Sequence, residues 1–219
     1  MKPNDPILTE CGSGRRHAAG ENPAKRDQIL DGAQQVFMKM GFDAASMNDI
    51  SKAAGVSKGT IYVYFADKVE LFEAIVLRER ERVFGGMQAI LEGGAPIGEK
   101  LGTFARNLGH ILCSKKVIRA QRIVIGTVEK MPELGSRFYE SGAYRTQVQL
   151  REFFAAETAA GRLRIENPDL AAMQFVDLAT GPLWRARLFT ASFGPPSEEE
   201  VDLVADSAVR MFMAAYGPD

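Results

Sequence analysis

The sequence predicts an all-α protein of about nine helices. From residue 23 onward, apolar residues recur at the three- and four-residue spacing of a helix, and no run alternates between apolar and polar residues as a half-buried strand would. The composition, 46% hydrophobic and 25% charged, is that of a folded globular protein. A length of 219 residues suits one domain plus a smaller module. No apolar stretch approaches the roughly 18 residues of a membrane span, so we expect no membrane partner.

Residues 1–22 are expected to form a flexible arm, because prolines and glycines occur there without helical periodicity. The arm lacks the continuous apolar segment of a secretory signal, which predicts a cytoplasmic protein. Cys11 in the arm and Cys113 in an apolar helical stretch do not suggest a disulfide framework. The formal net charge of −1 does not indicate binding to a nucleic acid or to an acidic membrane surface. Evidence for function therefore has to come from local sequence patterns.

The first helix is predicted from about Pro23 to Met40. Proline suits the first turn of a helix, and Gly41 provides the stop. One apolar stripe runs along the segment and consists of Ile29, Leu30, Ala33, Val36, Phe37 and Met40.

A short second helix is predicted from about Met47 to Ala54. Ser46 and Asp49 have the spacing of a capping box, in which each side chain accepts a hydrogen bond from the other residue's backbone N–H. Gly55 can adopt the left-handed conformation that ends this helix and turns the chain sharply.

The third helix is predicted from about Lys58 to Phe65, with Ser57 as its N-terminal cap. Ile61 and Phe65 stand four residues apart and therefore share the inward face, which leaves tyrosines and polar residues for the outer faces. Asp67 and Glu70 repeat the capping pattern and open a long fourth helix.

The glycines between Gly85 and Gly98 mark a soft boundary between an N-terminal unit, residues 23–84, and a larger C-terminal unit, residues 85–219. Prolines and glycines divide the second unit into five further helices. They are predicted at about Ile97–Cys113, Val117–Met131, Leu134–Ala160, Asp169–Ser192 and Glu198–Tyr216.

The segment of about residues 46–66 has the pattern of a helix-turn-helix: two short capped helices joined at a glycine. In this motif the second helix enters the DNA major groove, and the first crosses the backbone. Lys58 and Tyr62 are then expected to face bases, with Asn48 at an adjacent base. Four further residues are candidate phosphate contacts: Ser46, Thr60, Tyr64 and Lys68.

Spacing alone leaves a purely structural alternative open, because short helix pairs with a glycine corner occur in many all-α proteins. Charge does not decide between them, since Pro23 to Gly85 holds nine Lys or Arg and nine Asp or Glu. The aromatic residues favour DNA binding. Tyr62 and Tyr64 lie on a helix whose core face is already supplied by Ile61 and Phe65, so at least one tyrosine is not needed for packing.

The stretch from Arg26 to Val76 resembles the DNA-binding domain of the TetR family of bacterial transcriptional regulators. The resemblance rests on a series of short motifs in unbroken order. They are Ile29-Leu30, Phe37, Gly41-Phe42, Asn48-Asp49-Ile50, Ala53 to Tyr62 (AAGVSKGTIY), Tyr64-Phe65, Lys68 and Leu71-Phe72. By position it implies phosphate contacts at Ser46, Thr60, Tyr64 and Lys68. It also implies base contacts at Asn48, Lys58, Gly59 and Tyr62. Met47 departs from the family, whose members often carry a small hydroxyl residue there.

The C-terminal unit is similar to a subgroup of this family that includes AcrR-like and AefR-like repressors. The similarity lies in Met131 to Leu134, Phe138-Tyr139, Gly161 to Leu163 and Pro168 to Ala172. The resemblance implies a repressor that binds a pseudo-palindromic double-stranded DNA operator and is released by a small, largely apolar effector. It also implies a homodimer through the last two helices, which are apolar enough to pair with a second copy.

Polar groups on otherwise apolar helices are candidates to orient such an effector. They are Arg106, His110, Cys113, Arg122, Glu129 and Trp184. Structural roles remain open for all of them, since ion pairs and core side chains give the same pattern. His110 and Cys113 are three residues apart, but two ligands do not make a metal site, so neither a metal nor a cofactor is predicted.

Two other classes of protein remain as alternatives. A small all-α enzyme or carrier would use the C-terminal cavity, but the chain has no GxSxG elbow, P-loop or GxGxxG, and we predict no enzymatic activity. A protein-interaction module would bind another protein through the N-terminal unit. Operator binding that weakens as salt rises would argue against it, because phosphate contacts release counterions.

Overall fold

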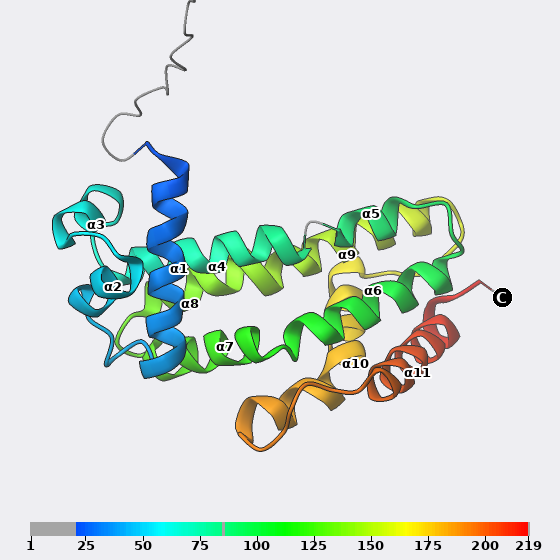
Figure 1. Cartoon of the computed structure of the whole chain (residues 1–219). Coiled ribbons are helices and arrows are strands. Elements are labelled where there is room, and N and C mark those ends of the chain that lie inside the picture. The colour runs from blue at the N-terminus through cyan, green and yellow to red at the C-terminus, as the bar shows by residue number, and fades with distance from the viewer. Residues whose placement is uncertain (1–20, 85, 219) are drawn as a thin grey trace, which may run out of the picture.

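The computed structural model describes residues 21–84 and 86–218, without the side chains of residues 80–84. Every regular element in this part of the chain is helical, so the predicted all-α fold is confirmed (Figure 1). The expected arm lies outside the described residues up to residue 20, and Cys11 lies there with it. The elements are α1 (Pro23–Met40), α2 (Met47–Ala54), α3 (Lys58–Tyr64), α4 (Lys68–Phe84), α5 (Met87–Glu92), α6 (Ile97–Leu112), α7 (Lys115–Thr127), α8 (Pro132–Tyr139), η1 (Glu140–Tyr144), α9 (Arg145–Ala159), α10 (Pro168–Phe189) and α11 (Glu198–Tyr216).

Two segments differ in detail from the sequence prediction. The glycine-rich stretch contains the short helix α5, because Met87 and Leu91 are buried in the C-terminal core and this packing outweighs the flanking glycines. The single helix expected over residues 134–160 is a continuous run of α8, η1 and α9, in which η1 is one π-helical turn.

One hydrophobic core lies under the N-terminal helices. Phe37 of α1, Phe42 of the following loop and Phe72 of α4 form its centre, with ring centroids 5.3 to 5.9 Å apart. This core extends beyond the N-terminal unit, because Val124 of α7 and Leu134 of α8 are buried in the same cluster. The helices on both sides of residue 85 therefore share one packed interior.

A second core joins the C-terminal helices. Phe154 of α9, Phe175 of α10 and Phe212 of α11 meet there, with the rings of Phe154 and Phe212 stacked at 4.7 Å. Phe104 brings α6 into the same cluster. In Figure 1, α2 and α3 lie at one end of the molecule and α11 at the other, with α4, α6 and α7 between them.

Buried charges fix two turns of the C-terminal unit. Arg187, whose side chain is 7% exposed, donates to the carbonyl oxygens of Leu183 and Gly194 and pairs with Glu200. The backbone N–H of Ser197, together with Arg187, holds the pKa of Glu200 below its ordinary value. These contacts tie the end of α10 to the start of α11. Burial raises the pKa of the neighbouring Cys113 thiol.

The turn after α9 is closed by a salt bridge that predicts a pH dependence of stability. Arg162 Nε donates to Glu157 Oε2 at 2.5 Å, and this hydrogen bond lowers the pKa of the buried Glu157. A pKa that is lower in the folded than in the unfolded chain adds stability above the unfolded value, and the contribution is lost as the pH falls through the folded value.

We expect Glu157→Gln to lower the free energy of unfolding by about 1 kcal/mol at pH 7, since Arg162 is largely exposed. The difference from the wild type should shrink as the pH falls below the ordinary glutamate pKa of about 4.3. Urea unfolding from pH 7 to pH 3 measures it. Glu152→Gln, an exposed position on the same helix, controls for the loss of one charge. A difference that stays constant down to pH 3 would contradict the assignment.

Candidate DNA-binding surface and effector cavity

Local hydrogen bonds cap α2 and α3 and form the turn between them. Ser46 and Asp49 form the predicted capping box at the start of α2, and the Ser46 hydroxyl lowers the pKa of Asp49. At the other end, Gly55 is left-handed, with φ 62° and ψ 36°. The N–H of Gly55 donates to Lys52 and that of Val56 to Ser51, which together make a Schellman motif. The Ser57 hydroxyl then accepts from Thr60 N–H and opens α3.

Helix α1 supports this pair at very close range. A Cβ placed on Gly32 would lie 2.6 Å from the backbone N and Cα of Ala54, so only glycine allows the two helices to approach this closely. Beside this contact, Gln28 Nε2 donates to the carbonyl oxygen of Ala54 at 2.7 Å. The end of α2 is thereby fixed against α1, immediately before the turn into α3.

The outer face of α3 carries the residues predicted to contact bases. Tyr62 is 49% exposed, and Lys58 Nζ lies 5.9 Å from the centre of its ring. Gly59 is exposed between them in sequence, and Asn48 is exposed on α2. Ile61, by contrast, is fully buried and anchors the inner face of α3. Thus α3 presents a polar and aromatic surface on a helix whose opposite side is packed.

The four predicted phosphate contacts occupy different environments. Ser46 is exposed at the start of α2, whereas Thr60 is half-buried and shares a 2.7 Å hydrogen bond with Ser57. Tyr64 is half-buried and packs against the N-terminal core.

Lys68 has a contact that the sequence did not suggest. Its ammonium group donates to the carbonyl oxygens of Phe42, Asp43 and Ala45 at 2.9 to 3.3 Å, and it lies 4.6 Å from the centre of the Phe42 ring. It therefore holds the loop between α1 and α2.

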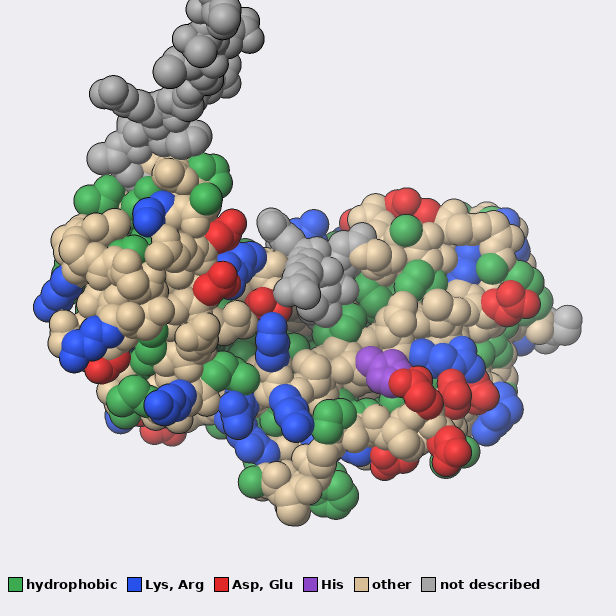
Figure 2. Space-filling view, viewed as in Figure 1, with side chains coloured by type: hydrophobic (Ala, Val, Ile, Leu, Met, Phe, Trp, Pro, Cys, Tyr) green, Lys and Arg blue, Asp and Glu red, His purple; other side chains and the backbone are tan. Residues whose placement is uncertain are grey.

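Two of the six predicted effector contacts lie in polar contacts between α6 and α11. Arg106 pairs with Asp202 at 2.6 Å and with Asp206 at 2.5 Å. His110 Nε2 lies 3.1 Å from Glu198. Figure 2 shows this face, with a histidine beside basic and acidic side chains. The described residues contain no group of three or more His, Cys, Asp or Glu side chains that could hold a metal ion.

Three of the other four candidates also lie in structural positions. Cys113 is buried with Leu183 and Val201, and Arg122 donates to the last carbonyl oxygens of α10, those of Arg187 and Leu188. Trp184 Nε1 donates to Gln121 Oε1 at 2.7 Å, and Glu129 is exposed. In the sequence, a polar residue on an apolar helix looks the same whether it contacts a ligand or a neighbouring helix.

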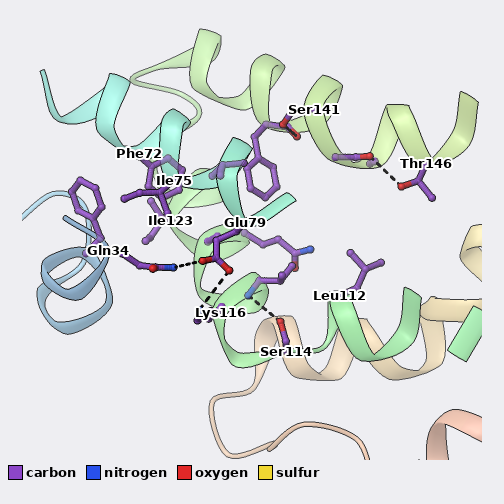
Figure 3. A pocket seen from close by; sticks show the side chains of 18 of the residues that line it. Gln34, Phe72, Ile75, Glu79, Leu112, Ser114, Lys116, Ile123, Ser141 and Thr146 are labelled. Atoms are coloured by element: carbon purple, nitrogen blue, oxygen red, sulfur yellow. Dashed lines mark hydrogen bonds and ion pairs between the residues drawn. The ribbon is translucent and has the colours of Figure 1, made fainter. Parts of the chain in front are cut away.

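A cavity of about 220 Å³ lies at the junction of the two units (Figure 3). It is bounded by α1, α4, α6, α7 and η1, and most of its lining is apolar, with Phe37, Phe72 and Phe138 among the side chains. None of the six candidates lines it, although Trp184 contacts Gln121, which does. Its polar members include Gln34, Glu79 and Lys116. Sequence reasoning missed them because they come from three helices far apart in the chain.

An open groove lies between α10 and α11. Leu178, Leu203, Val204 and Met211 line it together with charged residues such as Arg210. Leu203 is 69% exposed and Met211 56% exposed, so both helices present apolar side chains outward.

Among the described residues, no helix is long and apolar enough to cross a membrane.

The part of the chain that the structure describes is all helical, with a helix-turn-helix at one end and a cavity behind it, and this arrangement fits the class of helix-turn-helix regulators. Two family models match the sequence. Residues 29–75 match bacterial regulatory proteins of the tetR family, and residues 99–218 match the C-terminal domain of AefR-like transcriptional repressors. The chain therefore belongs to the TetR family of transcriptional regulators, and the resemblance inferred from the sequence is confirmed.

Curated relatives match over part of their length. The regulator UidR of Escherichia coli K12 is 38% identical over 68 residues, which are 31% of this chain and 35% of UidR. The regulator AcrR of Shigella flexneri is 31% identical over 110 residues, half of each chain. The chain thus spans about a third to a half of the length of these relatives.

Solved structures match over nearly the whole chain. A TetR-family regulator from Mesorhizobium loti has a TM-score of 0.80 at 29% identity and covers 89% of this chain and 97% of its own. The flavonoid-responsive regulator FrrA has a TM-score of 0.74 at 33% identity, and the match covers 90% of this chain and 99% of FrrA.

Proposed function

We propose that this protein is a transcriptional repressor of the bacterial cytoplasm that binds a pseudo-palindromic operator as a homodimer. A small, largely apolar effector bound in the cavity between the two units would release it. The observation that carries the proposal is the outer face of α3, where Lys58 and Tyr62 are exposed on a helix fixed by capping and by the Gly32–Ala54 contact. In this proposal the chain has no catalytic role.

The proposed contacts divide by chemistry. Lys58, Gly59 and Tyr62 read base edges in the major groove, with Asn48 at a neighbouring base. Ser46, Thr60 and Tyr64 contact phosphates and set the register of the helix pair. Lys68 contributes by holding the loop before α2, since three backbone carbonyl groups already accept from its ammonium group. The effector cavity is assigned to Gln34, Glu79 and Lys116 and the apolar residues around them, in place of the six residues suggested by sequence.

Binding of the purified protein to DNA from immediately upstream of its own gene tests the proposal. Random DNA serves as competitor, and the salt concentration is varied. We expect a specific complex with two protein chains per operator and an affinity that falls as salt rises, because phosphate contacts release counterions. Random DNA should bind weakly, given the formal net charge of −1. Equal affinity for operator and random DNA would contradict the proposal.

The homodimer is proposed to form through α10 and α11, which expose apolar residues along their shared groove. We expect Leu203→Asp to weaken dimerisation by about 2 kcal/mol or more, about 30-fold in the dissociation constant, because two-fold symmetry places the new charge in the interface twice.

Light scattering across a dilution series measures this change. Ile125→Asp on α7 is a matched control, since Ile125 is 55% exposed and lies outside the groove. The proposed interface is wrong if Leu203→Asp remains dimeric at the same concentrations as the wild type.

A further inference from the structure

The cavity behind the helix-turn-helix has one polar corner, where three helices meet. Gln34 of α1, Glu79 of α4 and Lys116 of α7 lie together there, as Figure 3 shows. Gln34 Nε2 lies 3.4 Å from Glu79 Oε1, and Lys116 Nζ lies 3.5 Å from Glu79 Oε2. A ligand at this corner therefore contacts the first helix of the DNA-binding unit directly.

Glu79 is the member of this corner with unused hydrogen-bonding capacity. A carboxylate accepts up to about four hydrogen bonds, and charge-assisted ones are ordinarily about 2.7–2.9 Å long. Within the described residues, the only donors to Glu79 are Gln34 and Lys116, and both contacts are long. The Glu79 side chain is only 23% exposed, so water does not fully replace the missing donors. A hydroxyl group on a ligand would supply one.

Charge at the corner selects a neutral ligand. An anion would approach the carboxylate of Glu79, and a cation would approach the ammonium group of Lys116, which already neutralises it. Lys116 is 55% exposed and is therefore the more solvated of the two. The corner as a pair has no net charge to balance a charged ligand.

The remaining walls favour a ring-bearing ligand of modest size. Phe37 and Phe72 contribute rings 5.9 Å apart at an edge-to-face angle of 72°, and Phe138 adds a third. Hydroxyl groups elsewhere in the lining are already engaged: Thr146 donates to Gly142 and Ser114 caps α7. A volume of about 220 Å³ is below the roughly 300–1,000 Å³ of sites for drug-sized ligands.

We propose that the effector is an uncharged molecule of about two rings whose hydroxyl group donates to the Glu79 carboxylate. This inference rests on the proposed function for its regulatory meaning. The hydroxyl group would replace the weak donation from Gln34, and the ring system would lie against Phe37 and Phe72. Effector binding would then loosen the contact between α1 and α4 at the place where the two units join.

Three two-ring probes that differ in one substituent test the proposal on the full chain without DNA. 4-Phenylphenol carries a hydroxyl donor, 4-methoxybiphenyl only an acceptor, and biphenyl-4-carboxylate an anion. We expect calorimetry to give 4-phenylphenol at least tenfold tighter binding than the other two. The emission of Trp184, the sole tryptophan, reports binding in the cavity, because its indole donates to the cavity residue Gln121.

Glu79→Gln keeps the size of the side chain and removes its charge. This variant should lower the affinity for 4-phenylphenol about tenfold, while the affinity for 4-methoxybiphenyl should change less than twofold. Glu99→Gln, on the exposed side of α6 and outside the lining, is the matched control and should leave all three affinities unchanged.

Equal affinities for the three probes, tighter binding of the carboxylate, no binding of any probe, or a preference that survives Glu79→Gln would each overturn the proposal. Operator binding is measured separately, so a failure of the ligand preference and a failure of the repressor function give different results. If both hold, saturating 4-phenylphenol should lower operator affinity in the wild type and less so in Glu79→Gln.

Discussion

Replacing Tyr62 by alanine should weaken operator binding by about 30-fold or more while leaving the fold intact. The ring is 49% exposed on α3, and Ile61 beside it supplies the buried contact of that turn. Loss of a good side-chain contact to a base costs about 1–3 kcal/mol, and 1.4 kcal/mol corresponds to a factor of ten. In a dimer the loss occurs in both half-sites. Fluorescence anisotropy with a labelled operator measures the effect.

A matched tyrosine is available as a control for this experiment. Tyr139 is 50% exposed at the end of α8, a helix outside the helix-turn-helix. Tyr139→Ala should bind the operator as the wild type does. Lys58→Ala should resemble Tyr62→Ala, because Lys58 lies over the same ring. Unchanged affinity in both α3 variants, with unchanged melting temperatures, would mean that this face of α3 does not enter the groove.

Replacing Gly32 by alanine should destabilise the protein by about 2 kcal/mol. The added Cβ would lie 2.6 Å from backbone atoms of Ala54, far inside contact distance, so α1 and α2 would have to move apart. Overpacking of this kind costs about 1–3 kcal/mol, sometimes more, and the better helix propensity of alanine recovers up to about 1 kcal/mol. Because α2 leads into α3, operator affinity should fall as well.

Gly126→Ala on α7 separates this clash from helix propensity. Nothing lies within 4 Å of a Cβ at Gly126, so this variant should be as stable as the wild type or up to about 1 kcal/mol more stable. Chemical unfolding of both variants gives the comparison. If Gly32→Ala unfolds at the same denaturant concentration as Gly126→Ala, the two helices are not in close contact.

Signals that act over a few residues could be predicted from the sequence. The capping box of Ser46 and Asp49, the turn at Gly55 and the cap at Ser57 each depend on neighbouring residues, and all three are present. The order of the helices followed for the same reason, because apolar spacing reports the buried side of each helix. One helix was predicted across Pro182, and α10 is indeed continuous through this residue.

Contacts between distant segments could not be predicted in this way. Lys68 looks like a surface cation in the sequence, yet its acceptors lie 23 to 26 residues earlier in the chain. Gly32 gives no apolar signal, although the close approach of α1 and α2 depends on it. The cavity combines residues from Gln34 to Val176, and polar residues on single helices pointed to ion pairs such as Arg106–Asp202 instead.

The shared interior of α1, α4, α7 and α8 limits how this chain can be recombined with others. Because Val124 and Leu134 complete the core around Phe37 and Phe72, a fragment that stops near residue 84 would expose the apolar surface that these residues cover. A hybrid protein that joins residues 23–84 of this chain to the C-terminal unit of a relative would place mismatched side chains in this shared core. The residues proposed to read the operator lie on the outer face of α3, outside this core, so they could be exchanged without changing it.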